Sequence, residues 1–289
     1  MRNTHTEKSN MFLSRYSTCI LSGPKMPAMF PIPVKMLLKI CSASLKSTAL
    51  KKIHEKLTRV AVIIVAYNQR ELALACLKHV TRLEYPADRL DIIVVDNNSG
   101  DGTPQAVRDR YPTAVVLEMG ENLGYAGGNN AGMEYALEQG ADWVLILNQD
   151  VVVAPDMLSP LLAAAKHEPR VGFLGPKVYH LEEPHRLQSA GIVLDSCLRS
   201  HQRGQGELDV GQFESIAECD ALAGCALFTS RPMIERIGML DLRFFMYHEE
   251  MDWCLRARAA GLRQPVRGRK QIPHLRGGGR CERDHAPAQ

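Results

Sequence analysis

The stretch Val60-Ala-Val-Ile-Ile-Val-Ala66 decides the fold class of this chain. This apolar and mostly β-branched run predicts a strand covered on both faces, because a strand with one wet face alternates apolar and polar residues. Tyr67-Asn68 ends the run, and residues 70–83 then have the apolar spacing of a helix, which Tyr85-Pro86 closes. A buried strand joined by a short link to a helix is the first half of a parallel β-α-β unit.

The same alternation continues along the chain. The next predicted elements are a strand at 92–95, a helix at 104–110, a strand at 114–117, a helix that follows the polar segment 121–130 and runs to Gln139, and a strand at 143–147. Their short links predict an α/β, Rossmann-like fold with a mostly parallel central sheet and helices on both faces. Farther on, residues 171–194 predict short strands of a smaller mixed sheet edge, and residues 199–219 predict a mobile loop that closes over a ligand.

Polar segments follow all four predicted strands, and in parallel sheets ligands bind outside the carboxyl ends. We therefore expect one composite pocket. Asp96 stands at a strand tip, suited to accept hydrogen bonds from a base or a ribose. Asp150, three residues past Leu147, has the position of a ligand to a hard cation, which proteins hold with one or two carboxylates and substrate phosphates. The position alone also allows Asp150 a structural role in opening the next turn.

Charge is distributed unevenly along the 289 residues, although the net charge is only +3. Residues 1–58 carry ten Lys/Arg against two Asp/Glu, and residues 262–289 carry seven against two, so the middle of the chain carries −10. An acidic body with basic ends excludes a nucleic-acid binder, whose basic residues line the folded surface. The length fits one large domain, or one with an appendage.

The first 58 residues predict no folded domain and no cleavable signal peptide, because prolines break their apolar region. Two interpretations remain: a disordered leader, or a basic arm that lies against an anionic membrane surface. No run reaches the roughly 18–20 apolar residues that a membrane span needs. The eight cysteines include no CxxC pair, which is typical of reduced thiols in a cytosolic protein rather than of a zinc site.

Several motifs occur together in one order. They are Val60-Ala-Val-Ile-Ile-Val-Ala-Tyr-Asn68, Ile93-Val-Val-Asp-Asn-Asn-Ser99, Glu121-Asn-Leu-Gly-Tyr-Ala-Gly-Gly-Asn-Asn-Ala-Gly132, Leu145-Ile-Leu-Asn-Gln-Asp150, Gly224-Cys-Ala-Leu-Phe228 and Phe245-Met-Tyr-His-Glu-Glu-Met-Asp-Trp-Cys-Leu-Arg256. In this order they resemble the family 2 inverting glycosyltransferases, especially the rhamnosyltransferase-like branch, over residues 59–262. The resemblance implies an A-type glycosyltransferase fold and a catalytic domain with these bounds.

The resemblance also implies a site. Nucleotide-sugar contacts would come from Tyr67, Asn68, Asp96, Asn98, Ser99, Asn122, Gly124, Asn129 and Asn148. Asn148-Gln149-Asp150 takes the place of the family's Asp-x-Asp metal motif, so Asp150 would bind Mg²⁺ or Mn²⁺, together with His274. Because an Asn replaces the first carboxylate, we expect the cation to bind well only when the nucleotide phosphates are present.

The catalytic base that the resemblance implies is the second residue of an acidic pair, which corresponds to Glu250. An inverting transfer needs a base within hydrogen-bond distance of the acceptor hydroxyl. Here the usual Glu-Asp pair is Glu249-Glu250, so Glu249 remains an alternative. The helix that follows would bury a stripe of side chains, namely Met251, Cys254, Leu255 and Ala259, and would carry an ion pair between Asp252 and Arg256.

The tail at 263–289 departs from the family pattern. Residues 264–270 are less apolar than the buried strand that the family has at this place, and the following helices are missing. The sequence therefore indicates an atypical basic tail, consistent with a truncated or frame-altered C terminus.

The sequence thus predicts an inverting hexosyltransferase that moves a sugar from a dTDP- or UDP-linked donor to a hydroxyl of a glycan or lipid-linked acceptor. Its expected setting is cell-surface polysaccharide synthesis in the bacterial cytoplasm, with peripheral contact at the inner face of the membrane. One alternative is an inactive, nucleotide-sugar-binding relative that acts as a partner subunit. A dinucleotide-binding oxidoreductase is disfavoured, because the glycine-rich segment follows the third strand and not the first.

Overall fold

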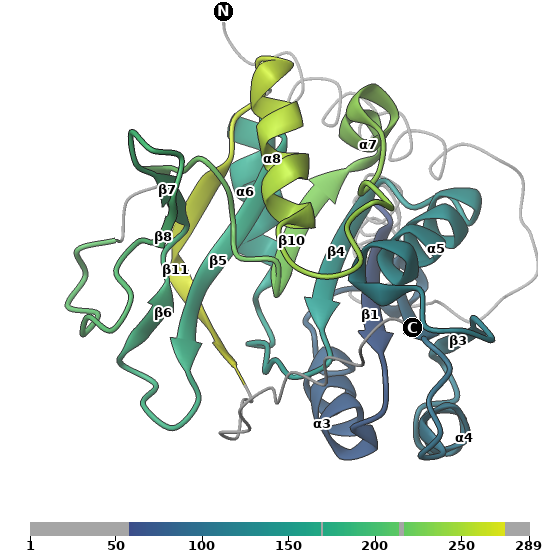
Figure 1. Cartoon of the computed structure of the whole chain (residues 1–289). Coiled ribbons are helices and arrows are strands. Elements are labelled where there is room, and N and C mark those ends of the chain that lie inside the picture. Colours follow the sequence, from purple (N-terminus) through teal and green to yellow (C-terminus); the bar gives the residue numbers. More distant parts are fainter. Residues whose placement is uncertain (1–57, 169, 214–216, 275–289) are drawn as a thin grey trace, which may run out of the picture. The chain divides into compact units, whose positions relative to one another are not determined.

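The computed structural model describes residues 58–168, 170–213 and 217–274, without the side chains of Ala217 and of 267–274. The predicted leader therefore lies outside the described residues, apart from Thr58, and so does the tail beyond His274. A nine-stranded sheet forms the middle layer of this part of the chain (Figure 1). Its strands are β1 (Val60–Ala66), β2 (Leu90–Asp96), β3 (Val115–Glu118), β4 (Trp143–Asn148), β5 (Phe173–His180), β6 (Leu187–Ser189), β9 (Ala217–Glu218), β10 (Ala226–Ser230) and β11 (Pro265–His274).

Along the main path the strands follow the order β3-β2-β1-β4-β10-β5-β11-β9, with β6 beside β5. The first four strands of the chain pair in parallel. β10 runs antiparallel to both of its neighbours, β4 and β5, while β5 and β11 are parallel. The predicted mostly parallel sheet is confirmed, with β10 reversed near its centre and the short strands β6 and β9 reversed beside β5 and β11.

Helices cover both faces of the sheet, as the sequence predicts (Figure 1). They are α3 (Arg70–Val80), α4 (Thr103–Arg110), α5 (Gly124–Glu138), α6 (Leu158–His167), α7 (Arg231–Ile237) and α8 (Glu249–Ala259), with a 3-10 turn η1 (Ala87–Arg89). Side chains of β1 alternate between the two cores: Val60, Val62 and Ile64 pack with α3, α4 and α6. Ala61 and Ile63 pack with α5, α7 and α8. The unbroken apolar run in β1 follows from this double burial.

Strand register brings the carboxyl ends level at one edge of the sheet. Ala66 at the end of β1 pairs with Asp96 of β2, and Val65 pairs with Asn148 of β4. Strands β2 and β4 flank β1, so their ends lie about 10 Å apart, two strand spacings. β10 starts at the same edge because it is antiparallel to β4, and its Ala226 pairs with Leu147. Asp96 and the segment that contains Asp150 therefore share one edge, as the predicted pocket requires.

The glycine-rich segment is helical from Gly124 onward, whereas the sequence predicted a helix only after residue 130. Helix α5 begins at Gly124, so the polar stretch is its first turns. The glycines let the helix approach the sheet: a Cβ on Gly128 would lie 2.8 Å from Val65 Cγ1, and one on Gly132 would lie 2.5 Å from Ile63 Cγ2. Close packing on β1 thus overrides the low helix propensity of glycine.

The buried face of α8 also differs from the prediction. Buried side chains include Trp253, Cys254 and Ala257, whereas Leu255 of the expected stripe is 37% exposed. Trp253 fixes this face, because its large ring packs inward and its indole N–H donates to the carbonyl of Gly238 (2.8 Å). The expected ion pair is present, with Arg256 Nε 2.8 Å from Asp252.

Two expectations about the second half are wrong in part. The segment 199–219, predicted to be a loop, contains two short strands, β8 (Ser200–Gln202) and β9. β8 pairs with β7 (Ile192–Leu194), and β9 pairs with β11. The basic stretch at 264–270 forms most of β11, because pairing with β5 depends on backbone groups and not on apolar side chains. No described helix is both long and apolar enough to cross a membrane.

Candidate active site

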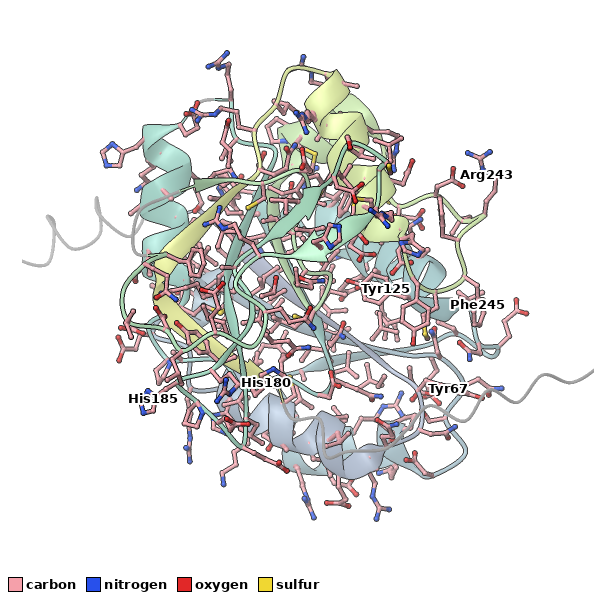
Figure 2. The ribbon with its side chains drawn as sticks, turned by 60° about the vertical axis from the view of Figure 1, so that its left-hand side comes forward. Tyr67, Tyr125, His180, His185, Arg243 and Phe245 are labelled. Atoms are coloured by element: carbon pink, nitrogen blue, oxygen red, sulfur yellow. The ribbon has the colours of Figure 1, made fainter. Side chains whose placement is uncertain are left out.

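A cavity of about 590 Å³ opens where the carboxyl ends of the strands meet. Its lining residues are Val65, Tyr67, Gln69, Leu72, Asn97, Asn122, Gly124, Tyr125, Asn148, Gln149, Asp150, Gly224, Cys225, Met246, Tyr247, Glu249 and Glu250. Figure 2 shows Tyr67 and Tyr125 on one side of the molecule, with Phe245 beside them. Members of this set predicted from the sequence are Tyr67, Asn122, Gly124, Asn148, Asp150, Glu249 and Glu250.

The other predicted side chains that the structure describes, those of Asn68, Asp96, Asn98, Ser99 and Asn129, do not line the cavity. Asp96 is buried, and its Oδ2 accepts a hydrogen bond from the Ser99 backbone N–H (2.9 Å). The hydroxyl of Ser99 in turn accepts the backbone N–H of Asn68 (2.8 Å). Asn98 is exposed, with a left-handed φ of 66°. Asn129 is buried and donates from Nδ2 to the carbonyl of Tyr125 (2.9 Å).

These contacts hold the ends of β1 and β2 together and brace the first turn of α5. One polar atom in the group has no protein partner: Asp96 Oδ1 is buried and accepts no hydrogen bond among the described residues. Such an atom costs free energy unless a donor reaches it, so Asp96 is still suited to accept a donor from a ligand or a water molecule.

The end of β4 supplies the candidate cation site. Asn148 and Asp150 line the cavity, and the Asn148 N–H donates to the carbonyl of Cys225 (3.1 Å). Burial raises the pKa of the Cys225 thiol to about 12, and the negative charge of Asp150 adds to this shift. The thiol therefore stays protonated at neutral pH and is a poor metal ligand.

The donor set at Asp150 fits a cation that also binds substrate phosphates. Among the described side chains no group of three or more His, Cys, Asp or Glu could hold a metal ion. Mg²⁺ and related hard cations need few protein carboxylates when phosphate oxygens and water complete their coordination. The backbone of His274 pairs with His180 at the end of β11, but its side chain lies outside the described residues, so its predicted metal contact stays a prediction.

The start of α8 brings two carboxyl groups into the cavity. Tyr247 and His248 just before it are left-handed, with φ of 76° and 71°, and this turn places Glu249 and Glu250 in the first helical turn. Burial, and then the charge of Glu250, raise the pKa of Glu249 to about 7. Burial also raises the pKa of Glu250. A carboxyl group with a pKa near neutrality is suited to exchange protons at physiological pH.

Close packing fixes the floor beneath Glu250. A Cβ on Gly224 would lie 3.4 Å from Glu250 Cγ, so Glu250 packs over this glycine. The hydroxyl of Tyr125 donates to the carbonyl of Gly224 (2.5 Å). Burial raises the pKa of Tyr125 well above its usual value, and the charges of Glu250 and Glu249 add to the shift. Tyr125 thus stays a neutral donor that ties α5 to the segment under Glu250.

Reasoning from the sequence missed several lining residues. Tyr125, Gln149 and Asn97 stand inside the motifs that resemble the family, so their positions carried a signal. Asn97 donates from Nδ2 to the carbonyl of Gly124 (2.8 Å) and joins β2 to α5. Cys225 also stands inside one of these motifs, Gly224-Cys-Ala-Leu-Phe228, but its place in the cavity depends on the antiparallel pairing of β10 with β4, which the motif does not report.

Comparison with known proteins adds independent information. The family model described as Glycosyl transferase family 2 matches residues 61–228. An N-acetylglucosaminyl-diphospho-decaprenol L-rhamnosyltransferase of Mycobacterium tuberculosis is 32% identical over 198 residues, which cover 60% of this chain and 62% of the relative. A galactofuranosyltransferase of Mycolicibacterium smegmatis is 30% identical over 210 residues, which cover 70% of this chain and 66% of the relative. The chain thus spans less than two thirds of the length of either relative.

Solved structures with the same fold include a mannosyltransferase from Pyrobaculum calidifontis in complex with GDP-Man and Mn²⁺. It matches with a TM-score of 0.55 at 23% identity, over 75% of this chain and 57% of that one. GalNAc-T7, solved with UDP, GalNAc and Mn²⁺, matches with a TM-score of 0.62 at 14% identity. The match covers 76% of this chain and 44% of GalNAc-T7. These likenesses confirm the fold that the sequence predicts.

Proposed function

The chain belongs to glycosyltransferase family 2, and on that premise we propose that it catalyses an inverting sugar transfer. The donor would be a nucleoside diphosphate sugar, and the acceptor a hydroxyl group of a glycan or lipid-linked saccharide. The observation that supports this most is the presence of Asp150 and the Glu249-Glu250 pair in one cavity. A cation site next to a basic carboxylate is what displacement of a diphosphate by a hydroxyl requires.

The proposed mechanism gives Glu250 and Asp150 separate tasks. Glu250 accepts the proton of the acceptor hydroxyl, whose oxygen forms a bond to the anomeric carbon of the donor. The bond from that carbon to the diphosphate oxygen breaks on the opposite side, so the configuration inverts. A bound Mg²⁺ or Mn²⁺ would neutralise charge on the departing diphosphate. Asp150 would hold this cation, together with the phosphates.

The remaining residues position the donor. Tyr67, Asn122 and Asn148 border the cavity and would contact the nucleotide and the sugar. Asp96 has a buried oxygen without a partner and would reach the base or ribose directly or through water. Tyr125 keeps the segment beneath Glu250 in place through its bond to Gly224.

The substrates are proposed by class. The Mycobacterium tuberculosis relative acts, by its name, on a saccharide linked through diphosphate to decaprenol. Two solved proteins of the same fold hold GDP-Man or UDP together with Mn²⁺. We propose a dTDP- or UDP-linked hexose as donor and a lipid-linked saccharide as acceptor, in cell-surface polysaccharide synthesis at the inner face of the membrane.

A single substitution tests the assignment of the base. The Glu250→Gln variant should keep its affinity for a nucleoside diphosphate with Mn²⁺, measured by calorimetry, and should lose transfer by about 1,000-fold, because Gln cannot accept a proton. Glu249→Gln serves as the matched control and should lose much less activity. Full transfer by the Glu250→Gln variant would disprove the role of Glu250, and loss in the control alone would move the base to Glu249.

A further inference from the structure

The segment that leads into α8 carries a cluster of exposed apolar side chains at the mouth of the cavity. Leu242, Phe245, Met246 and Tyr247, which we call the rim cluster, are 70, 55, 51 and 59% exposed. Met246 and Tyr247 also line the cavity, so the cluster is continuous with the candidate site. Contiguous exposed apolar side chains next to a functional cavity mark an interaction surface.

Helix α5 braces the backbone of this segment on one side. The Tyr125 N–H donates to the carbonyl of Phe245 (2.8 Å). The Asn130 side chain donates to the carbonyl of Leu240 (2.8 Å) and accepts its N–H (3.1 Å). The contact with Phe245 is so close that a Cβ on Gly124 would lie 2.2 Å from the Phe245 carbonyl oxygen. The rim cluster is therefore presented by a backbone that is fixed in position.

Helix α8 braces the other side. The Arg256 guanidinium donates to the carbonyls of Ile237 (2.6 Å) and Met239 (2.7 Å). Tyr247 and His248 are both held in the left-handed region, which residues with a Cβ adopt at a cost. The surrounding contacts thus hold the segment in one conformation, so the exposure of these apolar side chains does not result from a loosely packed loop. Each side chain stays more than half exposed, although the Phe245 ring packs over Gly124 and Met246 and Tyr247 border the cavity.

The charge of the segment indicates what it contacts. Residues 239–247 contain two charged side chains, Asp241 and Arg243, which pair with each other at 2.5 Å. Figure 2 shows Arg243 and Phe245 at the periphery of the molecule, on the same side as Tyr67. A projecting segment with aromatic and aliphatic side chains, an arginine and no net charge has the composition of surfaces that enter the boundary between lipid headgroups and acyl chains.

We propose that the rim cluster inserts into the surface of a lipid bilayer and thereby places the mouth of the cavity against the membrane. Leu242 and Phe245 make the apolar contact with lipid, whereas Met246 and Tyr247 border the path by which an acceptor enters. The inference rests on the proposed function in one respect, namely that a lipid-linked acceptor gives the enzyme a reason to work at a membrane.

Vesicle binding tests this inference with the full chain. We expect the wild-type chain to sediment with phosphatidylcholine vesicles in high salt. These vesicles carry no anionic lipid, and salt screens any remaining electrostatic attraction of the basic residues 1–58 to the surface. The double variant Leu242→Ser/Phe245→Ser should bind these vesicles about tenfold or more weakly, because two apolar side chains are lost. A matched control is Leu198→Ser/Val210→Ser, which removes apolar side chains that are 78 and 83% exposed elsewhere and should bind as the wild type does.

A second measurement separates membrane contact from other roles. Thermal stabilisation by UDP with Mn²⁺ should be the same in the double variant and the wild type; its loss in the double variant would assign the rim cluster to the fold or the donor site. Equal vesicle binding by the double variant, or no binding of neutral vesicles by the wild type, overturns the inference. The inference also fails if the wild-type chain forms a dimer without vesicles and the double substitution dissociates it. The rim cluster would then contact a second copy of the chain. Salt-resistant vesicle binding that depends on the rim cluster supports the inference even if no sugar transfer is found, so the two proposals can fail separately.

Discussion

Glu249 is almost completely buried at the start of α8, only 4% exposed, and its Oε2 has no protein hydrogen-bond partner. Because burial and the neighbouring Glu250 raise the pKa of Glu249 to about 7, the folded protein holds its proton more tightly than the unfolded chain does. The protonated Glu249 carboxyl therefore makes its full contribution to the free energy of unfolding below the unfolded pKa of about 4.3. This contribution is lost as the pH rises through about 7.

This residue gives a testable dependence of stability on pH. In the Glu249→Gln variant the side chain cannot ionise, so the free energy of unfolding relative to wild type should increase by about 2–3 kcal/mol between pH 5 and pH 8. Urea denaturation at the two pH values measures the difference. Glu134→Gln on the exposed face of α5 is the control and should show no such change. An equal difference at both pH values would contradict the buried, protonated state of Glu249.

At the scale of elements, α5 lies against β1 with no room for side chains at its glycines. A Cβ at Gly132 would lie 2.5 Å from Ile63 Cγ2 and 3.0 Å from Val95 Cγ2, both in the buried core. The distance between helix and sheet is therefore set by Gly132 and its neighbours. The same distance sets the position of Tyr125 at the start of the helix, and with it the floor of the cavity.

Substitution of Gly132 should consequently affect both stability and the site. Gly132→Ala should lower the free energy of unfolding by about 1–3 kcal/mol, because overpacking outweighs the gain in helix propensity. Gly100→Ala is the matched control, since a Cβ there would have no atom within 4 Å. Chemical denaturation of the two variants measures the effect. Unchanged or increased stability of Gly132→Ala would show that α5 can move away from the sheet at little cost.

The elements differ in how far the sequence could predict them. β1, β2 and β4 were predicted closely, because their apolar runs are local and both faces are buried. The start of α5 was missed because glycine has low helix propensity, and only contact with Val65 and Ile63 shows why glycine is required there. The predicted buried face of α8 was right for Cys254 and wrong for Leu255, because the contact of Trp253 with the segment before α8 outweighs the regular spacing of smaller apolar residues. Both errors concern contacts between distant parts of the chain.

At the scale of the whole molecule, a ligand that binds only the folded chain must stabilise it. UDP or dTDP with Mn²⁺, at about 100 times its Kd, should add about 2.7 kcal/mol and raise the Tm by roughly 5–10 °C for a domain of this size. We expect little shift from either component alone, because the proposed cation site has one carboxylate, that of Asp150, and would need phosphate oxygens to complete the coordination. Thermal melts with each component, and with both, measure this.

The matched variant for this experiment is Asp150→Asn, which should lose the part of the shift that depends on Mn²⁺. NAD serves as the control ligand and should give no shift. Stabilisation by NAD in place of the nucleoside diphosphates would favour a dinucleotide-binding protein. An equal effect of Mn²⁺ on the Asp150→Asn variant would place the cation elsewhere.

The sequence predicted the part of the candidate site that the ends of the parallel strands form. Parallel strands bring Tyr67 and Asp150 to one edge by a general rule of such sheets. The position of Cys225 and the burial of Asp96 depend on the order of strands in the finished sheet and on loop contacts, which local patterns do not report.

The reversed strand β10 has a consequence for the order of events during synthesis. It lies between β4 and β5, yet it follows both of them in the chain. Until the ribosome has delivered residues 226–230, β4 has an open edge that can pair with another polypeptide. The floor of the cavity is missing for the same period. A nascent chain therefore gains the floor of its cavity and the protection of β4 from aggregation in one late step, when β10 joins its neighbours, and Glu249 and Glu250 follow with α8.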